Sequence, residues 1–213
     1  FRWIKDNLKK INYLRIFLFI ICLSLSYFII KDTSLSILIS TIFGGSAIYL
    51  FLTTVKDLFR KKLLIAQSIS HFGFSLFLLS ILFNSIFSNE FSANMKIGEE
   101  LKYKNESIKF LNLKTFEKDN YKSLVANFEI INSNSSVSMF PEVRIYNEPN
   151  ILTSEADIIT SAFTDKFIVM NLIKGEEIFN VRYQTKPFMI WIWMSTILIA
   201  LGGLVSLFKK KYE

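Results

Sequence analysis

His71 is the only histidine in the chain, and it lies within a long apolar run. Gln67, Ser68 and Ser75 stand at positions i−4, i−3 and i+4 from it, so that in a helix the four residues form one polar stripe. A neutral imidazole in an apolar setting is a good axial ligand for haem iron, and the two serines are small enough for a flat group to lie against the ring. The alternative is a histidine that is hydrogen-bonded to a neighbouring helix.

Two further groups have residue types suited to binding. Glu142 and Arg144 are two residues apart, so that in a strand they share one face. Their simplest interpretation is a surface ion pair on a solvated face. Trp191 and Trp193 lie near the start of the last apolar run, where they fit an interfacial aromatic belt, although aromatic residues also line haem sites.

The sequence excludes several other kinds of chemistry. It contains no Walker A loop, no Gly-x-Gly-x-x-Gly and no His-Glu-x-x-His. The single cysteine, Cys22, excludes an internal disulfide framework and a cysteine-based metal cluster. No carboxylate falls inside a predicted span, which disfavours a proton relay or an ion-coupled transporter.

The elements that must position these residues are hydrophobic helices. Of the 213 residues 51% are hydrophobic and the mean hydropathy is +0.36, values that are typical of a membrane protein. Runs long enough to span a bilayer lie at about 13–30, 35–55, 63–87 and 187–208. His71 is then about 12 Å into the third span, where an ionisable group is costly and by default functional. The adjacent glycines at 44 and 45 predict close helix packing in the second span.

The basic residues predict the orientation in the membrane. They precede the first span, fill the loop between the second and third spans, and follow the fourth: Lys5, Lys9, Lys10, Lys56, Arg60, Lys61, Lys62, Lys209, Lys210 and Lys211. By the positive-inside rule these ends are cytoplasmic. We therefore expect a multi-pass protein of the bacterial inner membrane, in preference to the mitochondrial one, with residues 1–12 and 209–213 inside and 88–186 outside. Because the chain starts at Phe1 rather than Met, we expect a piece of a longer chain.

Residues 88–186 have the pattern of a β domain. They carry 12 basic and 14 acidic residues, so the net charge of +7 reflects topology rather than a nucleic-acid patch. Strands are predicted at 108–113, where the alternation is only rough, and at 124–131, 143–146 and 167–172, with turns at 132–136 and 174–177. The predicted fold class is an α-helical integral membrane protein with four spans and an inserted extracytoplasmic antiparallel β domain, a small barrel or sandwich.

Four segments of the chain stand in a distinctive order and spacing. They are residues 66–73 (Ala-Gln-Ser-Ile-Ser-His-Phe-Gly), 140–146 (Phe-Pro-Glu-Val-Arg-Ile-Tyr), 153–158 (Thr-Ser-Glu-Ala-Asp-Ile), and 187–193 (Pro-Phe-Met-Ile-Trp-Ile-Trp) with Leu201-Gly202-Gly203. In turn they resemble the His-x-Gly stretch of a late transmembrane helix, the Pro-Glu-x-Arg-x-Tyr motif, the Thr-x-Glu-Ala-x-Ile stretch and the last span of the CcmF family. These are the cytochrome c-type biogenesis haem lyase proteins. The resemblance extends from about Ala66 to the C-terminus.

The resemblance implies a role in cytochrome c maturation. In this family a large inner-membrane protein accepts haem from a haem chaperone and helps attach its vinyl groups to the Cys-x-x-Cys-His thiols of apocytochrome c. The family also holds a haem b in the membrane between two transmembrane histidines. His71 stands where one of them stands, and Gln67, Ser68 and Ser75 then surround that ligand.

We expect structural or partner-docking roles for the remaining candidates, because Glu142 and Arg144 lie far in sequence from any cofactor ligand. These candidates are Glu142, Arg144, Tyr146, Glu155, Trp191 and Trp193. The expected partners are membrane lipid, the haem chaperone, apocytochrome c, thiol-delivering maturation proteins and the N-terminal remainder of the same protein. No nucleic acid is expected.

The sequence also departs from the family pattern. The tryptophan-rich segment that binds incoming haem and the second haem b ligand are not among these residues, so the piece is not competent alone for haem attachment. Ser195 replaces a glycine, and residues 117–121 keep the Asn-Tyr but not the Gly-Pro of a family motif. The alternative function is a membrane-anchored extracytoplasmic assembly or binding module without a cofactor, and haem content distinguishes the two.

Overall fold

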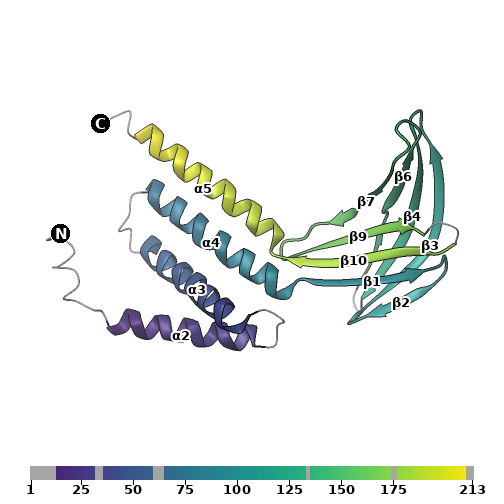
Figure 1. Cartoon of the computed structure of the whole chain (residues 1–213). Coiled ribbons are helices and arrows are strands. Elements are labelled where there is room, and N and C mark those ends of the chain that lie inside the picture. Colours follow the sequence, from purple (N-terminus) through teal and green to yellow (C-terminus); the bar gives the residue numbers. More distant parts are fainter. Residues whose placement is uncertain (1–12, 32–35, 60–64, 133–134, 174–176, 210–213) are drawn as a thin grey trace. The chain divides into compact units, whose positions relative to one another are not determined.

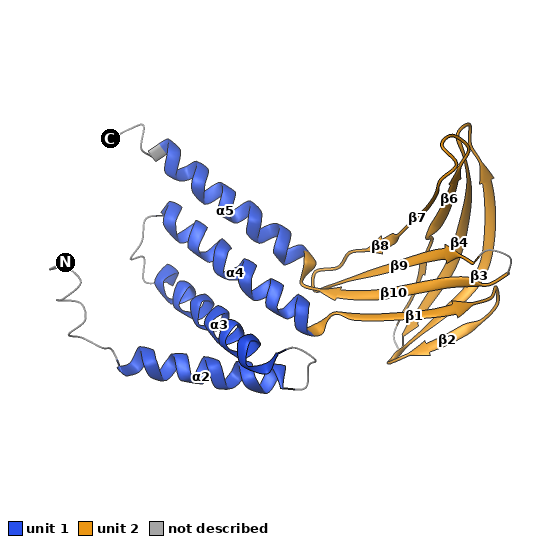
Figure 2. Cartoon of the chain, viewed as in Figure 1, with its two compact units in different colours: residues 1–86, 190–213 blue, residues 87–189 orange. Residues whose placement is uncertain are grey.

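The computed structural model describes residues 13–31, 36–59, 65–132, 135–173 and 177–209. The chain forms two compact units (Figure 2), one built from residues 1–86 and 190–213 and the other from residues 87–189. Four predictions fall wholly or mostly outside the described residues: the terminal stretches 1–12 and 209–213, the basic loop at 60–62 and the turn at 174–177.

The first unit consists, in its described residues, of four apolar helices (Figure 1). They are α2 (Tyr13–Ile30), α3 (Ile37–Phe59), α4 (Ile65–Phe87) and α5 (Met189–Lys209). Each is long and apolar enough to cross a membrane, and many of their Leu, Ile and Phe side chains are exposed, as a lipid environment favours. The predicted four-span membrane fold is confirmed.

Two helix boundaries differ from the sequence prediction. α3 continues past residue 55 and includes Lys56 and Asp57 in its last turn, where a long basic stem can carry its charge to the membrane surface. α5 starts at Met189 rather than at Pro187, because Pro187 ends the preceding strand and pairs with Thr164. A proline is tolerated at such a strand end, where its missing N–H removes little from the sheet.

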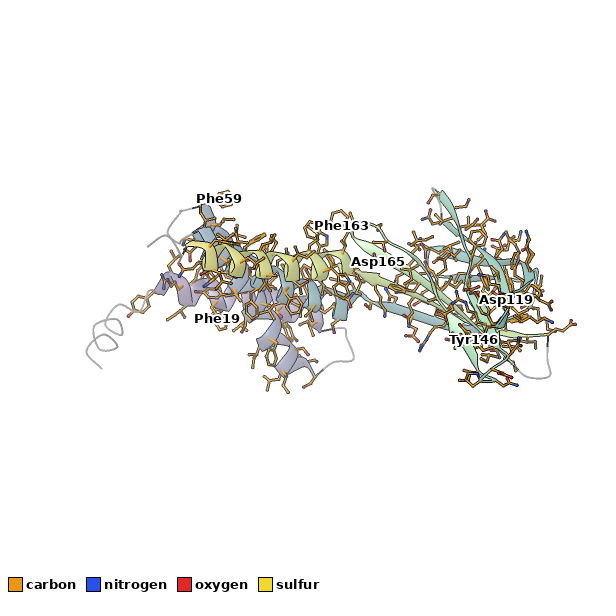
Figure 3. All side chains as sticks on the ribbon, turned by 90° about the horizontal axis from the view of Figure 1, so that it is seen from above. Phe19, Phe59, Asp119, Tyr146, Phe163 and Asp165 are labelled. Carbon is orange, nitrogen blue, oxygen red and sulfur yellow. The ribbon has the colours of Figure 1, made fainter. Side chains whose placement is uncertain are left out.

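α2 and α3 pack closely, as the two adjacent glycines predict. A Cβ atom at Gly45 would lie 2.9 Å from the Leu23 Cα, so any larger residue there would push the two backbones apart. One turn further along α3, Tyr49 meets Phe19 of α2 edge-on with ring centroids 5.4 Å apart. Phe19 is labelled in Figure 3.

The second unit is a β-sandwich of antiparallel strands. They are β1 (Asn89–Met95), β2 (Glu100–Tyr103), β3 (Glu106–Glu117), β4 (Tyr121–Asn132), β5 (Ser135–Met139), β6 (Glu142–Tyr146), β7 (Leu152–Glu155), β8 (Asp157–Ile159), β9 (Thr164–Leu172) and β10 (Phe179–Pro187). One sheet has the order β1-β10-β9-β8, and the other has the order β2-β3-β4-β6-β7 with β5 also paired to β4. The predicted β domain is therefore a sandwich rather than a barrel.

Apolar side chains at alternate positions of the two sheets form one core. Ala126, Phe128 and Ile130 of β4 are almost fully buried. Phe110 of β3 stacks on Phe128 with centroids 4.4 Å apart, and Phe179 of the other sheet meets Phe110 edge-on. A β-bulge follows Phe110, which explains why the alternation in residues 108–113 is only rough.

A polar link also joins the two sheets of the sandwich. Glu106 of β3 accepts a hydrogen bond from the buried Tyr183 hydroxyl of β10 at 2.6 Å, and its other oxygen lies 2.6 Å from Lys166 Nζ of β9. Burial raises the pKa of Tyr183, and the hydrogen bond to Glu106 raises it further. The raised pKa keeps Tyr183 neutral, so that its hydroxyl can donate to Glu106.

Candidate functional site

The structure divides the predicted polar stripe of α4 into an open and a buried part. His71 is the seventh residue of α4, and its side chain is exposed, as is that of Gln67 one turn earlier. Ser68 and Ser75 are buried, and the Ser75 hydroxyl donates a hydrogen bond to the Phe72 carbonyl at 2.9 Å. His71 and Gln67 therefore share an accessible face, while the two serines lie in the helix packing.

The surroundings of His71 suit a planar apolar ligand. Phe74, three residues further along the helix, is 50% exposed beside it. Within the described part of the chain His71 has no hydrogen bond or ion pair, and no group of three or more His, Cys, Asp or Glu is placed to hold a metal ion. A single imidazole with both ring nitrogens available fits an axial ligand of haem, because the porphyrin supplies the in-plane donors.

Small residues fix how α4 packs against α5. A Cβ atom at Gly73 of α4 would lie 3.0 Å from the Ser195 carbonyl oxygen, and one at Gly202 of α5 would lie 2.9 Å from the Ala66 carbonyl oxygen. Gly73 and Ala66 thus face α5. His71 is roughly 150° around the helix from both, at 100° per residue, so the α4–α5 contact leaves its side chain uncovered.

The start of α5 carries the two predicted tryptophans. Trp193 is 65% exposed and Trp191 is partly buried. Ser195, which stands where the resemblance predicts glycine, is fully buried, and its hydroxyl donates to the Ile192 carbonyl at 2.7 Å. The serine is accommodated in the helix contact because its own helix satisfies the hydroxyl. An aromatic-belt role for the tryptophans stays a prediction.

The second group of predicted residues lies on the outer face of the six-stranded sheet, opposite the fully buried Val143. Arg144 Nε donates to Glu142 Oε1 at 2.5 Å, and Glu142 Oε2 accepts a hydrogen bond from Ser123 of β4 at 2.5 Å. Glu155 of β7 lies 3.9 Å from Arg144 Nη1. The ion pair predicted within β6 thus connects β4, β6 and β7.

Aromatic rings extend this arrangement. The Arg144 guanidinium lies over the Tyr121 ring, 5.2 Å from its centroid, and the Tyr121 and Tyr146 rings are 5.1 Å apart. Figure 3 labels Tyr146 together with Asp119, which lies two residues before Tyr121. We call the set formed by Tyr121, Ser123, Glu142, Arg144, Tyr146 and Glu155 the Arg144 cluster.

The electrostatics of the Arg144 cluster differ from those of a fully solvated pair. The side chains of Arg144 and Glu142 are only 31% and 21% exposed. Burial opposes ionisation of Glu142, but hydrogen bonds from Ser123 and Arg144 outweigh it and hold the pKa of this carboxyl below its usual value. The contacts with Glu142 and Tyr146 raise the pKa of Arg144. The cluster is therefore a partly buried, ionised pair bordered by two partly buried tyrosine rings.

Sequence reasoning missed Ser123 and Tyr121 as members of the cluster. Both belong to β4 and reach Arg144 only through the β4–β6 register, in which Ser123 pairs with Arg144 and Tyr121 with Tyr146. The sequence signal for these residues is that polar or aromatic side chains recur at alternate positions of β4. The register between β4 and β6, however, cannot be read from one sequence.

The helices and the sandwich together define a class, a membrane protein with a β-sandwich between its third and fourth described helices. Residues 86–187 match a family described as the CcmF C-terminal beta-sandwich. The cytochrome c-type biogenesis protein CcmF of Escherichia coli is 27% identical to this chain, and the alignment covers all of this chain and 34% of the relative. The protein of the same name from Haemophilus influenzae is also 27% identical, over 68% of this chain and 22% of the relative.

A solved structure supports the fold. It is described as cytochrome c heme lyase CcmF, and it superposes with a TM-score of 0.65 at 16% identity over 89% of this chain and 33% of that one. Together these comparisons support a C-terminal part of a CcmF-family protein. The chain spans about a third or less of the length of the relatives it matches.

Proposed function

We propose that this chain takes part in cytochrome c maturation as the C-terminal part of a membrane haem lyase. The observation that carries the proposal is the open face of α4, where His71 stands exposed beside Gln67 and Phe74 in a helix able to cross a membrane. Similarity to the CcmF family supports the same role, since the chain's relatives are named for cytochrome c biogenesis.

In this proposal His71 supplies one axial ligand of a haem b. Its Nε2 binds iron, and its Nδ1–H donates to an acceptor, because an unpaired donor in the membrane costs several kcal/mol. Gln67 tunes the ligand from one turn away, whereas the buried Ser68 and Ser75 hold the helix in place. Bound haem b supplies a one-electron redox centre. The second ligand belongs to residues outside this chain.

The β domain serves the same function outside the cytoplasm. The Arg144 cluster presents tyrosine rings around a satisfied ion pair, a composition that is enriched at protein interfaces. We assign the Arg144 cluster, which includes Glu155, to the architecture of the domain and to docking of apocytochrome c or of thiol-delivering maturation proteins. Haem itself arrives from a haem chaperone.

Replacing His71 by Ala in the full-length protein tests the ligand. We expect bound haem to fall sharply, and any residual haem to show an altered low-spin spectrum, because one axial donor is lost while the apolar face of α4 remains. Added imidazole should restore part of the spectrum. The matched control is Ile81→Ala, which removes an exposed apolar side chain from the same helix without removing a donor.

The decisive measurements are haem per protein and the absorption spectrum of membrane-inserted protein. A stably inserted His71→Ala protein with unchanged haem content and spectrum would return His71 to a helix-packing role. The chain would then fit the alternative, an anchored extracytoplasmic assembly module without a cofactor.

A further inference from the structure

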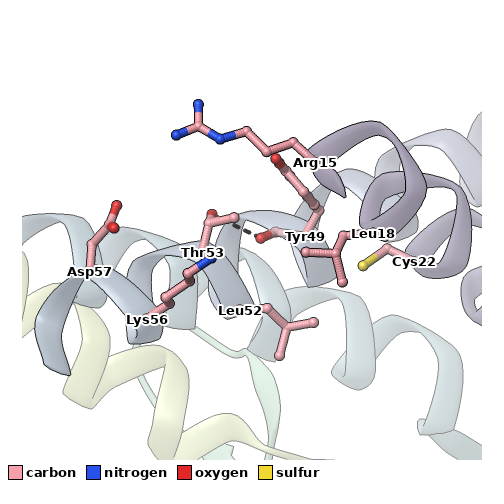
Figure 4. A pocket seen from close by; sticks show the side chains of 8 residues that line it. All are labelled: Arg15, Leu18, Cys22, Tyr49, Leu52, Thr53, Lys56 and Asp57. Atoms are coloured by element: carbon pink, nitrogen blue, oxygen red, sulfur yellow. Dashed lines mark hydrogen bonds between the residues drawn. The ribbon is translucent and has the colours of Figure 1, made fainter. Parts of the chain in front are cut away.

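A cavity of about 290 Å³ lies between α2 and α3, and neither His71 nor any residue of the Arg144 cluster lines it. Figure 4 shows the eight residues that line it, three from α2 and five from α3: Arg15, Leu18, Cys22, Tyr49, Leu52, Thr53, Lys56 and Asp57. The two helices approach closely where Gly45 meets Leu23. Because crossing helices separate with distance from their contact, space opens between them toward the start of α2 and the end of α3.

The lining changes from apolar to charged along the cavity. Leu18, Leu52 and the buried Cys22 form its apolar lining. Arg15 is in the first turn of α2 and Lys56 is in the last turn of α3, so these charges lie at helix ends, where the membrane surface is expected. This combination suits a ligand with an apolar chain and a polar head.

All the charged residues of α2 and α3 line this one cavity. They are Arg15, Lys56 and Asp57. Within the described residues none of the three forms an ion pair. Three charges gathered around one cavity, with no ion pair among the described residues, can bind a charged head group at the membrane surface.

The charges and hydroxyls specify the head group. Two cations and one carboxylate leave one positive charge, which matches the single negative charge of a phosphodiester. The Thr53 hydroxyl is already bonded to the Tyr49 and Leu50 carbonyls at 2.9 and 3.0 Å, whereas the Tyr49 hydroxyl points toward Arg15 in Figure 4. Arg15, Lys56 and Tyr49 therefore supply the donors for a phosphate group.

We propose that this cavity is a binding site for an anionic glycerophospholipid. Its phosphate is held by Arg15, Lys56 and the Tyr49 hydroxyl, and one acyl chain lies along Leu18 and Leu52. Basic pockets between transmembrane helices recognise anionic head groups in this manner. The site is independent of haem binding, and it would fasten the α2–α3 pair to one leaflet of the membrane.

The test uses the full-length protein in detergent, with phosphatidylglycerol or phosphatidylcholine added and bound lipid counted by native mass spectrometry. The wild-type protein should prefer phosphatidylglycerol. Arg15→Gln and Lys56→Gln should each lower that preference about fivefold, the loss expected for one basic group near an anionic lipid. The matched control is Lys31→Gln, which removes an exposed cation at the other end of α2 and should change nothing.

Asp57→Asn gives a second test in the opposite direction. Removing the carboxylate should strengthen phosphatidylglycerol binding, because it removes repulsion without removing a donor. This variant keeps the proposal open to refutation even where loss of a cation impairs insertion. If Asp57→Asn instead weakens lipid binding, the carboxylate holds a head-group amine and the proposal of a site for an anionic lipid is wrong. Equal binding of both lipids by the wild-type protein, as expected where another part of the protein fills the cavity, also overturns it.

Discussion

The contact between Arg144 and Glu142 joins more strands than its position in the sequence indicates. The two residues are neighbours on one face of β6, and spacing alone predicts this. The hydrogen bond from Ser123 adds β4, and the approach of Glu155 adds β7. Sequence reasoning therefore identified the pair but not its setting, because residues on other strands come together only through sheet register.

We predict that Arg144→Ala reduces cytochrome c maturation several-fold while haem content stays near the wild-type level. The substitution leaves Glu142 partly buried without its partner, and it uncovers the Tyr121 ring. Yield of covalent cytochrome c and haem per protein are the two readouts. Lys122→Ala is the matched control, since it breaks an ion pair with Glu117 whose side chains are 53% and 73% exposed, where such pairs contribute little.

Hydrogen exchange separates docking from folding in the same variant. Preserved protection of the β4 and β6 amides with lower maturation supports a docking role for the Arg144 cluster, and lost protection supports an architectural one. Loss of haem at a normal protein level would contradict both, because it would place the cluster in the haem site.

Since the pKa of Glu142 lies below its usual value, the stability that this carboxylate contributes is present above about pH 4.3 and is lost as pH falls through the lower folded-state pKa.

Helices and strands were predictable to different degrees. Apolar runs of membrane length give the helices directly, and they differ only at ends such as residues 55–59, where charged residues join the last turn. The strands at 124–131, 143–146 and 167–172 were found because they alternate or are apolar. β1, with the sequence Asn-Glu-Phe-Ser-Ala-Asn-Met, escaped prediction because an edge strand with one solvated face needs few apolar residues.

Adjacent glycines in α5 give a matched test of how α4 is placed. A Cβ atom at Gly202 would lie 2.7 Å from the Ser70 amide nitrogen, whereas one at Gly203 meets nothing within 4 Å. Gly202→Ala must therefore push the helices apart, with a cost of about 1–3 kcal/mol. Gly203→Ala should be neutral or stabilising by up to about 1 kcal/mol, because alanine favours a helix.

Thermal unfolding of the two variants, followed by the helical circular dichroism signal in detergent, measures the difference. We expect a lower midpoint for Gly202→Ala only. The α4–α5 contact positions α4, which carries His71. Gly202→Ala should therefore also lower haem content, while Gly203→Ala should not. Equal behaviour of the two variants would mean that this helix contact does not hold α4 in place.

For the whole molecule the sequence predicted the class of fold, and the orientation in the membrane stays a prediction. The four helices and the sandwich follow from periodicity and length, and the CcmF family match agrees with them. The clusters of lysine and arginine stand at the termini and in the loop between α3 and α4. The connection between α2 and α3 has one lysine, Lys31, next to an acidic residue. This asymmetry predicts that both termini are cytoplasmic and that residues 88–186 lie outside.

Cysteine labelling in intact cells tests this orientation. Cys22, the single cysteine, is first replaced by Ala, and a cysteine is then introduced at Ser135, which is exposed at the start of β5. We expect a membrane-impermeant thiol reagent to label this position in intact cells, because the positive-inside rule keeps the basic loops in the cytoplasm and moves the sandwich across the membrane. The matched control is Phe59→Cys, at the 82% exposed end of α3, which should react only after the cells are lysed. The contrary outcome is labelling of Ser135→Cys only after lysis, with Phe59→Cys reactive in intact cells. That result would invert the topology and place the Arg144 cluster in the cytoplasm. The cluster would then be away from the compartment where apocytochrome c receives its haem in the proposed function.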